Sequence, residues 1–253
     1  MASAHDPKAG SQHVFDRQFH LCESLSDYYS TEELIMTCPD CSRFVALCCQ
    51  HRNHGRPRAC HHYQLVFTDG ACLSNGQTAA TSGLGVAIGQ DAELQWTVPV
   101  DDIVDPNAKR SSQRAELLAA IEGLRLLNAV DGPEDAHSRL YNRHGKPGDK
   151  PTVSYRNWVI TTDSKYVVDG MTDWLPNKWK LNGMRTYDGR VPANLDLFLR
   201  LDQEIAALEC QRDVRIGFWH VPRQYNAIAD RLAKDAAKRA PVASPLRSPN
   251  HAF

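Results

Sequence analysis

Four acidic residues occur inside apolar segments, where a buried carboxylate is unfavourable. Two follow runs with the pattern of buried strands (LVFTDG and WVITTDS), and two lie in helical patterns with apolar neighbours (SSQRAELLAAIEGL and NAIADRLAKDAAK). They are Asp69, Asp163, Glu116 and Asp230. Several carboxylates brought together are stable only when a cation neutralises them. Oxygen donors favour a hard divalent ion, Mg²⁺ or Mn²⁺. The four segments are therefore expected to converge on a metal site of the kind found in enzymes that cut or join phosphodiesters.

From residue 64 onward the sequence alternates between strand and helix patterns. Short apolar runs predict strands at 64–68, 83–89, 94–98, 157–162 and 215–220. Apolar stripes with helical spacing predict helices at 113–130, 164–174, 194–208 and 226–239. Three consecutive strands favour an antiparallel meander, and the later alternation favours parallel strands beside it. The expected fold class is α/β, with a five-stranded mixed sheet flanked by helices.

Composition divides the chain into four parts. Residues 1–19 are polar and patternless, which predicts disorder. Residues 20–62 contain six of the eight cysteines. Residues 63–240 form the α/β domain, in which the Gly- and Pro-rich stretch 131–156 reads as a surface insertion. Residues 241–253 are expected to form a flexible tail.

Charge and hydropathy narrow the expected partners and location. The net charge of -1 gives no global sign of nucleic-acid binding, so any basic surface must be local. No apolar stretch reaches the ~20 residues that span a bilayer. The N-terminus has no signal-peptide pattern, which favours an intracellular protein, nuclear or cytoplasmic rather than mitochondrial. A monomer without a membrane partner is the default expectation.

In order and spacing, the sequence resembles the type 1 ribonuclease H family. The matching segments are FTDGACLSN, SSQRAELLAAIEGL, VITTDSKYVVDGM, WLPNKWKLNG followed by GRVPANLDLF, and FWHVPRQYNAIADRLA. The resemblance covers roughly residues 64–238, and the ordered combination of TDG, QRAEL, TDS and H-x9-D makes it specific. It implies an RNase H-like fold with element order βββαβααβα. It also implies a metal-dependent endoribonuclease that hydrolyses the RNA strand of RNA–DNA hybrids, leaving 5′-phosphate and 3′-hydroxyl ends.

The resemblance implies that Asp69, Glu116, Asp163 and Asp230 together bind two Mg²⁺ ions, with Mn²⁺ as a substitute. His220, ten residues before Asp230, is similar to the family's mobile histidine, which assists proton transfer or product release. At a strand end it is also compatible with a packed, hydrogen-bonded histidine. Asn226 matches the N-x3-D spacing of the same motif and is implied as a substrate contact.

Further positions resemble the family's contacts to the two nucleic-acid strands. Contacts to the RNA and its 2′-hydroxyls are implied for Gly70, Cys72, Asn75, Ser112 and Gln113. For Cys72, a small buried hydrophobe is the alternative. For the DNA strand, the resemblance implies a phosphate pocket, an aromatic channel and a basic protrusion. The phosphate pocket comprises Lys109, Ser111 and Asn194, and the aromatic channel comprises Tyr166 and Trp174. The basic protrusion comprises Lys178, Trp179, Lys180, Arg185 and Arg190. A solvated charged loop is the alternative for the last group.

The sequence departs from the family's pattern at three positions, Lys165, Met184 and Ser112. These changes concern fine substrate contacts and not the metal site. Two other functions remain open on the same fold: a non-catalytic nucleic-acid-binding module, and a nuclease with a different substrate, such as an integrase-like enzyme. Retention of all four acids argues against the first, and the phosphate pocket with the basic protrusion argues against the second.

Cys38-Pro-Asp-Cys41 has the C-x2-C spacing of a zinc knuckle. Tetrahedral Zn²⁺ needs four nitrogen or sulfur ligands, typically as two spaced pairs. We expect one structural Zn²⁺ on Cys38, Cys41, His51 and Cys60. The second pair stays ambiguous, with Cys49, His54 and His62 as alternatives, and unligated thiols are the other interpretation. The segment does not resemble the hybrid-binding domain at the N-terminus of many eukaryotic type 1 enzymes.

Overall fold

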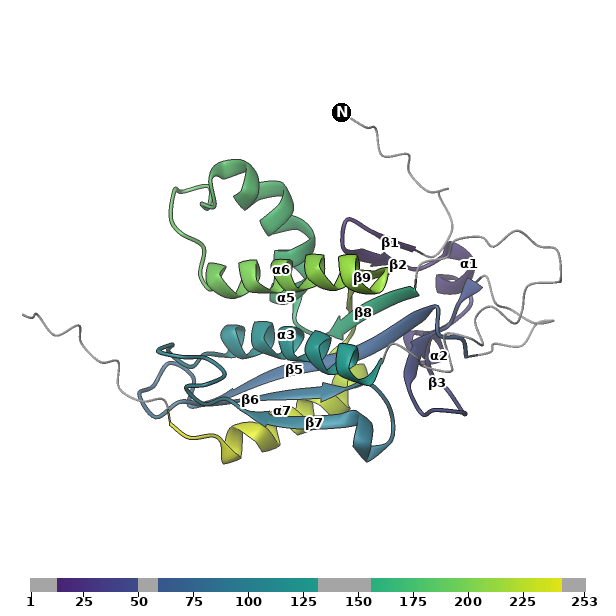
Figure 1. Ribbon diagram of the computed structural model, residues 1–253, viewed down its shortest axis with the longest axis horizontal. Coiled ribbons are helices and arrows are strands. Elements are labelled where there is room, and N and C mark those ends of the chain that lie inside the picture. The colour runs from purple at the N-terminus through teal and green to yellow at the C-terminus, as the bar shows by residue number, and fades with distance from the viewer. Residues whose placement is uncertain (1–12, 50–58, 132–155, 243–253) are drawn as a thin grey trace, which may run out of the picture.

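The computed structural model describes residues 13–49, 59–131 and 156–242 (Figure 1). Its centre is a mixed sheet of β5 (Tyr63–Leu73), β6 (Thr81–Ala87), β7 (Gln95–Pro99), β8 (Arg156–Thr162) and β9 (Val214–His220). β5, β6 and β7 form an antiparallel meander, whereas β8 lies parallel to β5 and β9 lies parallel to β8. The predicted five-stranded core and its strand directions are therefore confirmed.

Helices cover both faces of this sheet (Figure 1). One face carries α3 (Ser112–Val130), α5 (Lys165–Asp169), the π-helical segment η3 (Gly170–Trp179), the short η4 (Lys180–Asn182) and α6 (Leu195–Arg212). The other face carries α7 (Ala227–Arg239), which follows the short turn η5 (Arg223–Asn226). The turn η2 (Ala92–Leu94) precedes β7. Among the described helices, none combines the length and the apolar character needed to cross a bilayer.

The N-terminal residues extend the sheet instead of standing apart from it. β1 (His13–Phe15) and β2 (Gln18–His20) form a hairpin that pairs with β9, while β3 (Ile35–Thr37) and β4 (Phe44–Ala46) form one that pairs with β5. The short helices α1 (Glu23–Ser26) and α2 (Thr31–Leu34) connect them. The prediction of disorder for 1–19 is therefore wrong for 13–19, where apolar side chains are buried; 1–12 lie outside the described residues.

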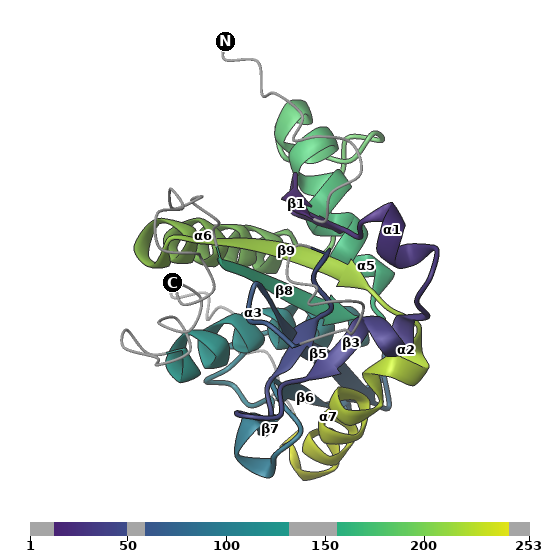
Figure 2. The ribbon, with the colours of Figure 1, turned by 90° about the vertical axis from the view of Figure 1, so that its right-hand side faces the viewer.

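Alternating side chains of the central strands enter two separate cores. On one face, Val66 and Ile160 pack with α3, η3 and α6. On the other face, Leu65 and Phe67 pack with Phe44 of β4, with α2 and with the first turns of α7. Figure 2 shows β3, α1 and α2 beside the central strands. The N-terminal segment thus covers the part of the second face that α7 leaves open.

Candidate active site

The four acidic residues come from four elements that meet at one end of the parallel strands. Asp69 lies in β5 and Asp163 directly follows β8, while Glu116 lies in α3 and Asp230 in the first turn of α7. β5 and β8 are paired in register from Tyr63 to Phe67, with Phe67 opposite Thr161. Asp69 lies two residues after Phe67, and Asp163 lies two residues after Thr161, so the two acids come at matching positions just beyond this ladder. The sheet therefore brings two of the acids together, and the helices add one from each face.

Burial and mutual repulsion make the anionic forms of two of these acids unfavourable. Asp69 is 5% exposed. Its pKa is raised to about 7 by burial and then by the neighbouring charges of Asp163 and Asp230. The pKa of Glu116 is raised to about 9 by burial and then by the charges of Asp69 and Asp163. Each acid thus lies within electrostatic reach of others. A cation placed among them would relieve this repulsion, and four carboxylates are the hard oxygen donors that Mg²⁺ or Mn²⁺ requires.

Two glycines allow the helices to approach the strands closely enough for this convergence. A Cβ at Gly70 would lie 2.1 Å from the main-chain carbon of Ala115, next to Glu116 in α3. A Cβ at Gly85 would lie 2.1 Å from the carbonyl oxygen of Ala229, next to Asp230 in α7. Neither position has room for a side chain. The Gly70 N–H also donates to Oε2 of Glu116 at 3.3 Å, which orients that carboxylate.

Asn226 is 1% exposed and holds two parts of the site together. Its Nδ2 donates to Oδ1 of Asp163 at 2.7 Å and to the carbonyl oxygen of Thr68 at 3.1 Å. The implied role of Asn226 as a substrate contact needs correction, because the buried amide faces Asp163 and β5. It positions a carboxylate instead, a role that depends on tertiary contacts and that the N-x3-D spacing alone did not reveal.

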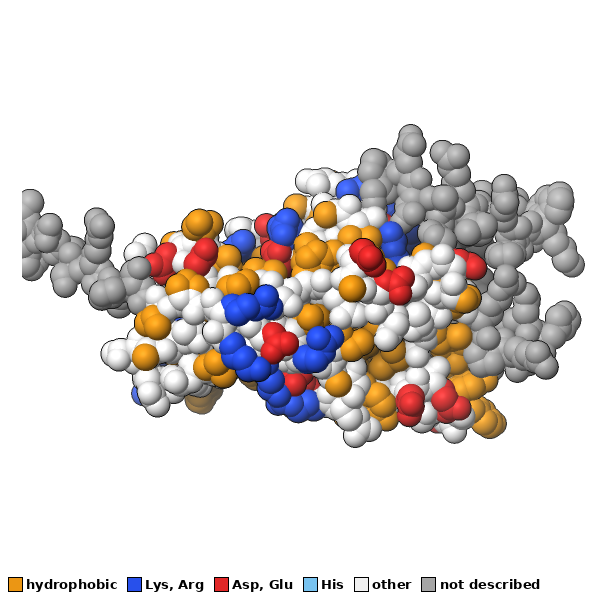
Figure 3. All heavy atoms as spheres, turned by 90° about the horizontal axis from the view of Figure 1, so that it is seen from below, with side chains coloured by type: hydrophobic (Ala, Val, Ile, Leu, Met, Phe, Trp, Pro, Cys, Tyr) orange, Lys and Arg blue, Asp and Glu red, His pale blue; other side chains and the backbone are white. Residues whose placement is uncertain are grey.

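Asp230 is paired with two cations that the sequence analysis did not single out. Arg223 donates a short hydrogen bond to one carboxylate oxygen, and Nζ of Lys234 lies 2.7 Å from the other. Burial by itself raises the pKa of Asp230, but the hydrogen bonds from Lys234 and Arg223 outweigh it and lower the pKa below its usual value. On the face that α7 forms, Lys and Arg side chains gather around acidic ones (Figure 3). The i, i+4 spacing of Asp230 and Lys234 was a signal that could have found the second pair.

His220 is exposed at the end of β9, beside the last residue of β8. Its Nε2 lies 3.3 Å from the main-chain carbonyl oxygen of Asp163. The side chain is therefore next to the acidic cluster and accessible to solvent, in contrast to the packed histidine that the strand pattern also allowed.

The residues expected to bind a DNA phosphate line one pocket of about 560 Å³. Its lining includes Lys109, Ser111, Gln113, Arg114, Asn194 and Asp196. Ser111 Oγ accepts the Arg114 N–H at 3.3 Å and caps α3, while Asn194 Nδ2 donates to the Tyr166 hydroxyl at 3.0 Å. Arg114 was missed by the sequence analysis although it stands inside the QRAEL motif. Its guanidinium is committed to Asp105 and Asp196, at 2.7 and 2.8 Å, so the exposed Lys109 is the cation facing the pocket.

The positions expected to contact RNA lie in or just after the last part of β5 and in the first turn of α3. Asn75 and Gln113 are exposed, while Cys72 and Ser112 are half-buried. Cys72 is therefore more accessible than the buried hydrophobe that was its alternative interpretation.

The two rings expected to form the aromatic channel lie in contact with each other. Tyr166 and Trp174 are half-buried, with ring centroids 5.7 Å apart. Trp179, expected in the basic protrusion, is only 8% exposed and packs against Phe198 at a centroid distance of 5.1 Å. The expectation of a substrate contact at Trp179 therefore needs correction, because its ring belongs to the core. The sequence pattern predicted a helix only as far as Trp174, whereas η3 extends to Trp179.

The basic stretch around Trp179 is exposed, and its cations have nearby partners. Lys178 pairs with Asp173 at 2.5 Å, Lys180 with Asp202 at 2.7 Å, and Arg190 with Asp188 at 3.0 Å. Arg185 donates to the carbonyl oxygen of Gly189 at 2.8 Å. The stretch is therefore less positive than a count of its Lys and Arg residues indicates.

The Cys/His-rich segment brings three of its side chains to one point. Sγ of Cys38 and of Cys41 lie 3.4 and 3.5 Å from Nε2 of His61. Cys60, expected as a ligand, is not in this group but lies beside Cys48, whose Sγ is 3.5 Å from Nδ1 of His62. The expected ligand His51 and the alternative His54 lie outside the described residues.

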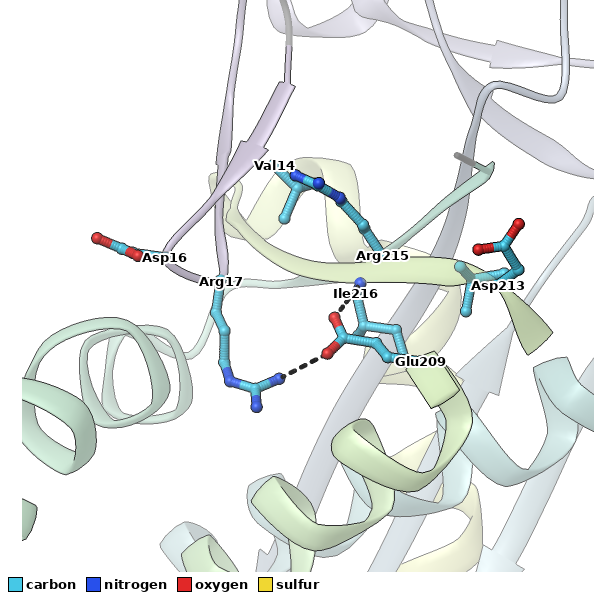
Figure 4. Close-up of a pocket in the computed structure, with 8 residues that line it drawn as sticks. Val14, Asp16, Arg17, Glu209, Asp213, Arg215 and Ile216 are labelled. Atoms are coloured by element: carbon cyan, nitrogen blue, oxygen red, sulfur yellow. Dashed lines mark hydrogen bonds and ion pairs between the residues drawn. The ribbon is translucent and has the colours of Figure 1, made fainter. Parts of the chain in front are cut away.

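A separate cavity of about 480 Å³ lies where the β1–β2 hairpin meets α6 and β9 (Figure 4). Within it Arg17 reaches Glu209 at 4.0 Å, and Glu209 accepts the Ile216 N–H at 2.9 Å. Arg17 also pairs with Asp202 at 3.0 Å. These contacts attach the hairpin to the sheet, and none of the residues that the sequence analysis proposed for function lines this cavity.

Comparison with known proteins gives one family. Mouse Ribonuclease H1 is 29% identical over 179 residues, which cover 69% of this chain and 50% of the relative. A Ribonuclease H from Caulobacter is 31% identical over 170 residues, covering 67% of this chain and 86% of the relative. The chain spans about half the length of the mammalian relatives it matches.

Solved structures give matches of lower similarity. The RNase H domain of PFV matches with a TM-score of 0.45 and 18% identity, covering 70% of this chain and 94% of that domain. LC11-RNase H1 in complex with an RNA/DNA hybrid matches with a TM-score of 0.38 and 20% identity, covering 69% and 96%. The family model described as RNase H matches residues 61–238. Because that match spans more than half of the chain and includes all four acidic positions, the chain belongs to the RNase H family.

Proposed function

We propose that this chain is a metal-dependent endoribonuclease that hydrolyses the RNA strand of RNA–DNA hybrids, leaving 5′-phosphate and 3′-hydroxyl ends. The observation that carries the proposal is the convergence of Asp69, Glu116, Asp163 and Asp230 from four separate elements. A cluster of anions that raises its own members' pKa values is unfavourable without a cation. In a chain of the RNase H family, such a cluster is expected to serve catalysis.

The four carboxylates are the residues that would hold two Mg²⁺ ions, or Mn²⁺ in their place. Bound there, the ions supply a water of lowered pKa and neutralise charge on the departing oxygen. The donor set fits because it offers only oxygen atoms, and because Asp69 and Glu116 become favourable as anions once positive charge is added.

The chain's own residues fix and assist this centre. Asn226 holds the Asp163 carboxylate, and the Gly70 N–H holds that of Glu116, so two of the four acids are oriented by hydrogen bonds. His220 is exposed beside Asp163. We assign it to proton transfer or product release, for which an imidazole side chain is suited.

Substrate binding would place the two strands on either side of the acids. The pocket with Lys109 would take a DNA phosphate, and the half-buried rings of Tyr166 and Trp174 would pack against DNA sugars. The end of β5, with Gly70 and the exposed Asn75, would approach the 2′-hydroxyls of the RNA. Recognition of 2′-hydroxyls is what would distinguish a hybrid from duplex DNA.

One observation favours a second function, a non-catalytic hybrid-binding module. Arg223 and Lys234 both pair with Asp230, and these contacts already neutralise one of the four acids. In a binding module they would replace the metal ions. In an enzyme they would have to release Asp230 when the ions bind.

One assay separates these functions. Labelled RNA–DNA, RNA–RNA and DNA–DNA duplexes are incubated with the protein in Mg²⁺ and in EDTA, and both cleavage and binding are measured. The enzyme cleaves only the hybrid, only with Mg²⁺, and Asp69→Asn abolishes cleavage while binding persists. Asp235→Asn, which removes a half-buried acid of α7 paired with Lys238, is the matched control and should cleave normally. Binding of the hybrid without cleavage would support the module instead.

A further inference from the structure

Cys38, Cys41 and His61 form a group outside the acidic site whose ligand atoms all lie within 4.8 Å of one another. Cys38 is buried, and the other two are half-buried. Neither cysteine forms a disulfide. Among the described residues, no other set of three His, Cys, Asp or Glu side chains meets this condition.

The distances in this group match those around a tetrahedral zinc ion. With Zn–S of about 2.3 Å and Zn–N of about 2.0–2.1 Å, tetrahedral angles require an S···N separation of about 3.6 Å. The two sulfur atoms lie 3.4 and 3.5 Å from Nε2 of His61. Both S···N separations are therefore close to those expected around a shared tetrahedral ion.

The backbone presents the two sulfur atoms in a tight turn between β3 and β4. The Cys38 N–H donates to the Arg43 carbonyl at 2.9 Å, and the Ser42 N–H donates to the Cys38 carbonyl at 2.8 Å. Ser42 closes the turn with a left-handed φ of 58°. The turn is thus fixed by main-chain contacts, while His61 lies 20 residues after Cys41 and two residues before the start of β5.

We propose that Cys38, Cys41 and His61 bind a structural Zn²⁺ that fastens the β3–β4 hairpin to the start of β5. Thiolate and imidazole donors select zinc over the Mg²⁺ expected at the carboxylates. Three protein ligands leave one tetrahedral position for water or a further ligand. The site is independent of the proposed nuclease function, because it lies at the opposite end of β5 from Asp69.

The proposed ion would stabilise the attachment of the β3–β4 hairpin to the sheet. β4 pairs with β5 through a single residue pair, Val45 with Gln64. Further main-chain hydrogen bonds join the hairpin to the residues after β6: the Phe44 N–H donates to the Ile88 carbonyl and the Gln90 N–H to the Ser42 carbonyl, both at 2.8 Å. The hairpin also carries Phe44, which packs against Phe67 with ring centroids 5.3 Å apart on the second face of the sheet. A metal bridge between the hairpin turn and His61, two residues before β5, would hold this cover in place.

The test is metal analysis of the full chain, purified without added chelator. Wild-type protein should contain about one zinc per chain, whereas Cys38→Ser and His61→Gln should lose it. Cys210→Ser, which removes an exposed thiol of α6, is the matched control and should keep it. Asp69→Asn should also keep its zinc, which separates this proposal from that of the nuclease.

Replacement of the bound ion by Co²⁺ gives a second readout on the wild-type protein, so the test survives if the variants fail to fold. Thiolate-to-cobalt charge-transfer absorption together with the d–d bands of tetrahedral Co²⁺ is expected. Wild-type protein without zinc and without this spectrum would overturn the proposal. So would zinc that stays fully bound in both Cys38→Ser and His61→Gln.

Discussion

The two ends of strand β5 differ in the donor atoms they offer. At its start, His61 joins two cysteine sulfur atoms in a group no wider than 4.8 Å. Towards its other end, Asp69 joins three further carboxylates, no three of which come as close together. The ligand atoms of the first group already lie close together, as is expected of a structural metal site. The second is open and under electrostatic strain, which is expected of a site that must exchange ions, water and substrate.

Under the two proposals, one strand would carry the ligands of two different kinds of metal ion. Donor type separates the ions, since sulfur and nitrogen favour zinc and oxygen favours magnesium. Distance separates their effects, because the six residue steps from Tyr63 to Asp69 in β5 extend about 20 Å. Changes at one end are therefore expected to leave the other end intact.

The largest effect is expected from a substitution in the acidic cluster. Asp69→Asn should lower kcat on an RNA–DNA hybrid by about 10³-fold or more, the scale of losing a preorganised electrostatic element. The measurement is single-turnover cleavage with Mg²⁺. Zinc content should not change, and a coupled loss of zinc would show that the two ends are not independent.

At the other end, Cys38→Ser should lower the free energy of unfolding by about 4 kcal/mol, the stabilisation given by a ligand at a thousand times its Kd. Urea unfolding of wild type and variant at equal zinc concentration measures this loss. The kcat of the folded fraction should stay unchanged, because the acids are untouched. Unaltered stability in a variant that has lost its zinc would refute a structural role.

Asn226→Ala sharpens the comparison within the acidic end. It removes the amide that orients the Asp163 carboxylate, and losing such a supporting hydrogen bond costs about 10–100-fold in metal affinity or activity. Titration of cleavage against Mg²⁺ concentration checks this. If the variant changed only KM for the hybrid, Asn226 would contact substrate as the sequence first implied.

The smallest effect is on the pH dependence of stability in Mg²⁺-free buffer with zinc retained. The pKa values of Asp69 and Glu116 are raised to about 7 and about 9, so the folded chain holds these protons more tightly than the unfolded chain does. Unfolding then releases protons, and stability should fall as pH rises from about 5 to about 9. Urea unfolding across this range should show the decline, and Asp69→Asn should reduce its slope. Rising stability would contradict the assigned strain.

The sequence predicted most of the central fold because its strands and helices are long enough to show periodicity. The N-terminal strands β1 to β4 have three residues each, too short for any period, and their pairing with the distant β5 and β9 has no local signal. The four acids were found through their apolar surroundings. The burial of Trp179 and Asn226 was missed because neighbours far away in the sequence determine it.

The metal ligands of the N-terminal segment illustrate the same limit. Cys38 and Cys41 were recognisable because their spacing is local. His61 was not singled out, since several histidines and cysteines stand close together and only the path of the chain selects among them. The pairing of Arg223 with Asp230 was likewise invisible in the motif.

The glycines at positions 70 and 85 have a consequence for how this protein can change. At these two glycines the main chains of α3 and α7 lie directly against the main chains of the strands. The distance of Glu116 and Asp230 from the sheet is therefore set by these main-chain contacts. A single methyl group at either position would lift a helix, and the carboxylate it carries, away from the rest.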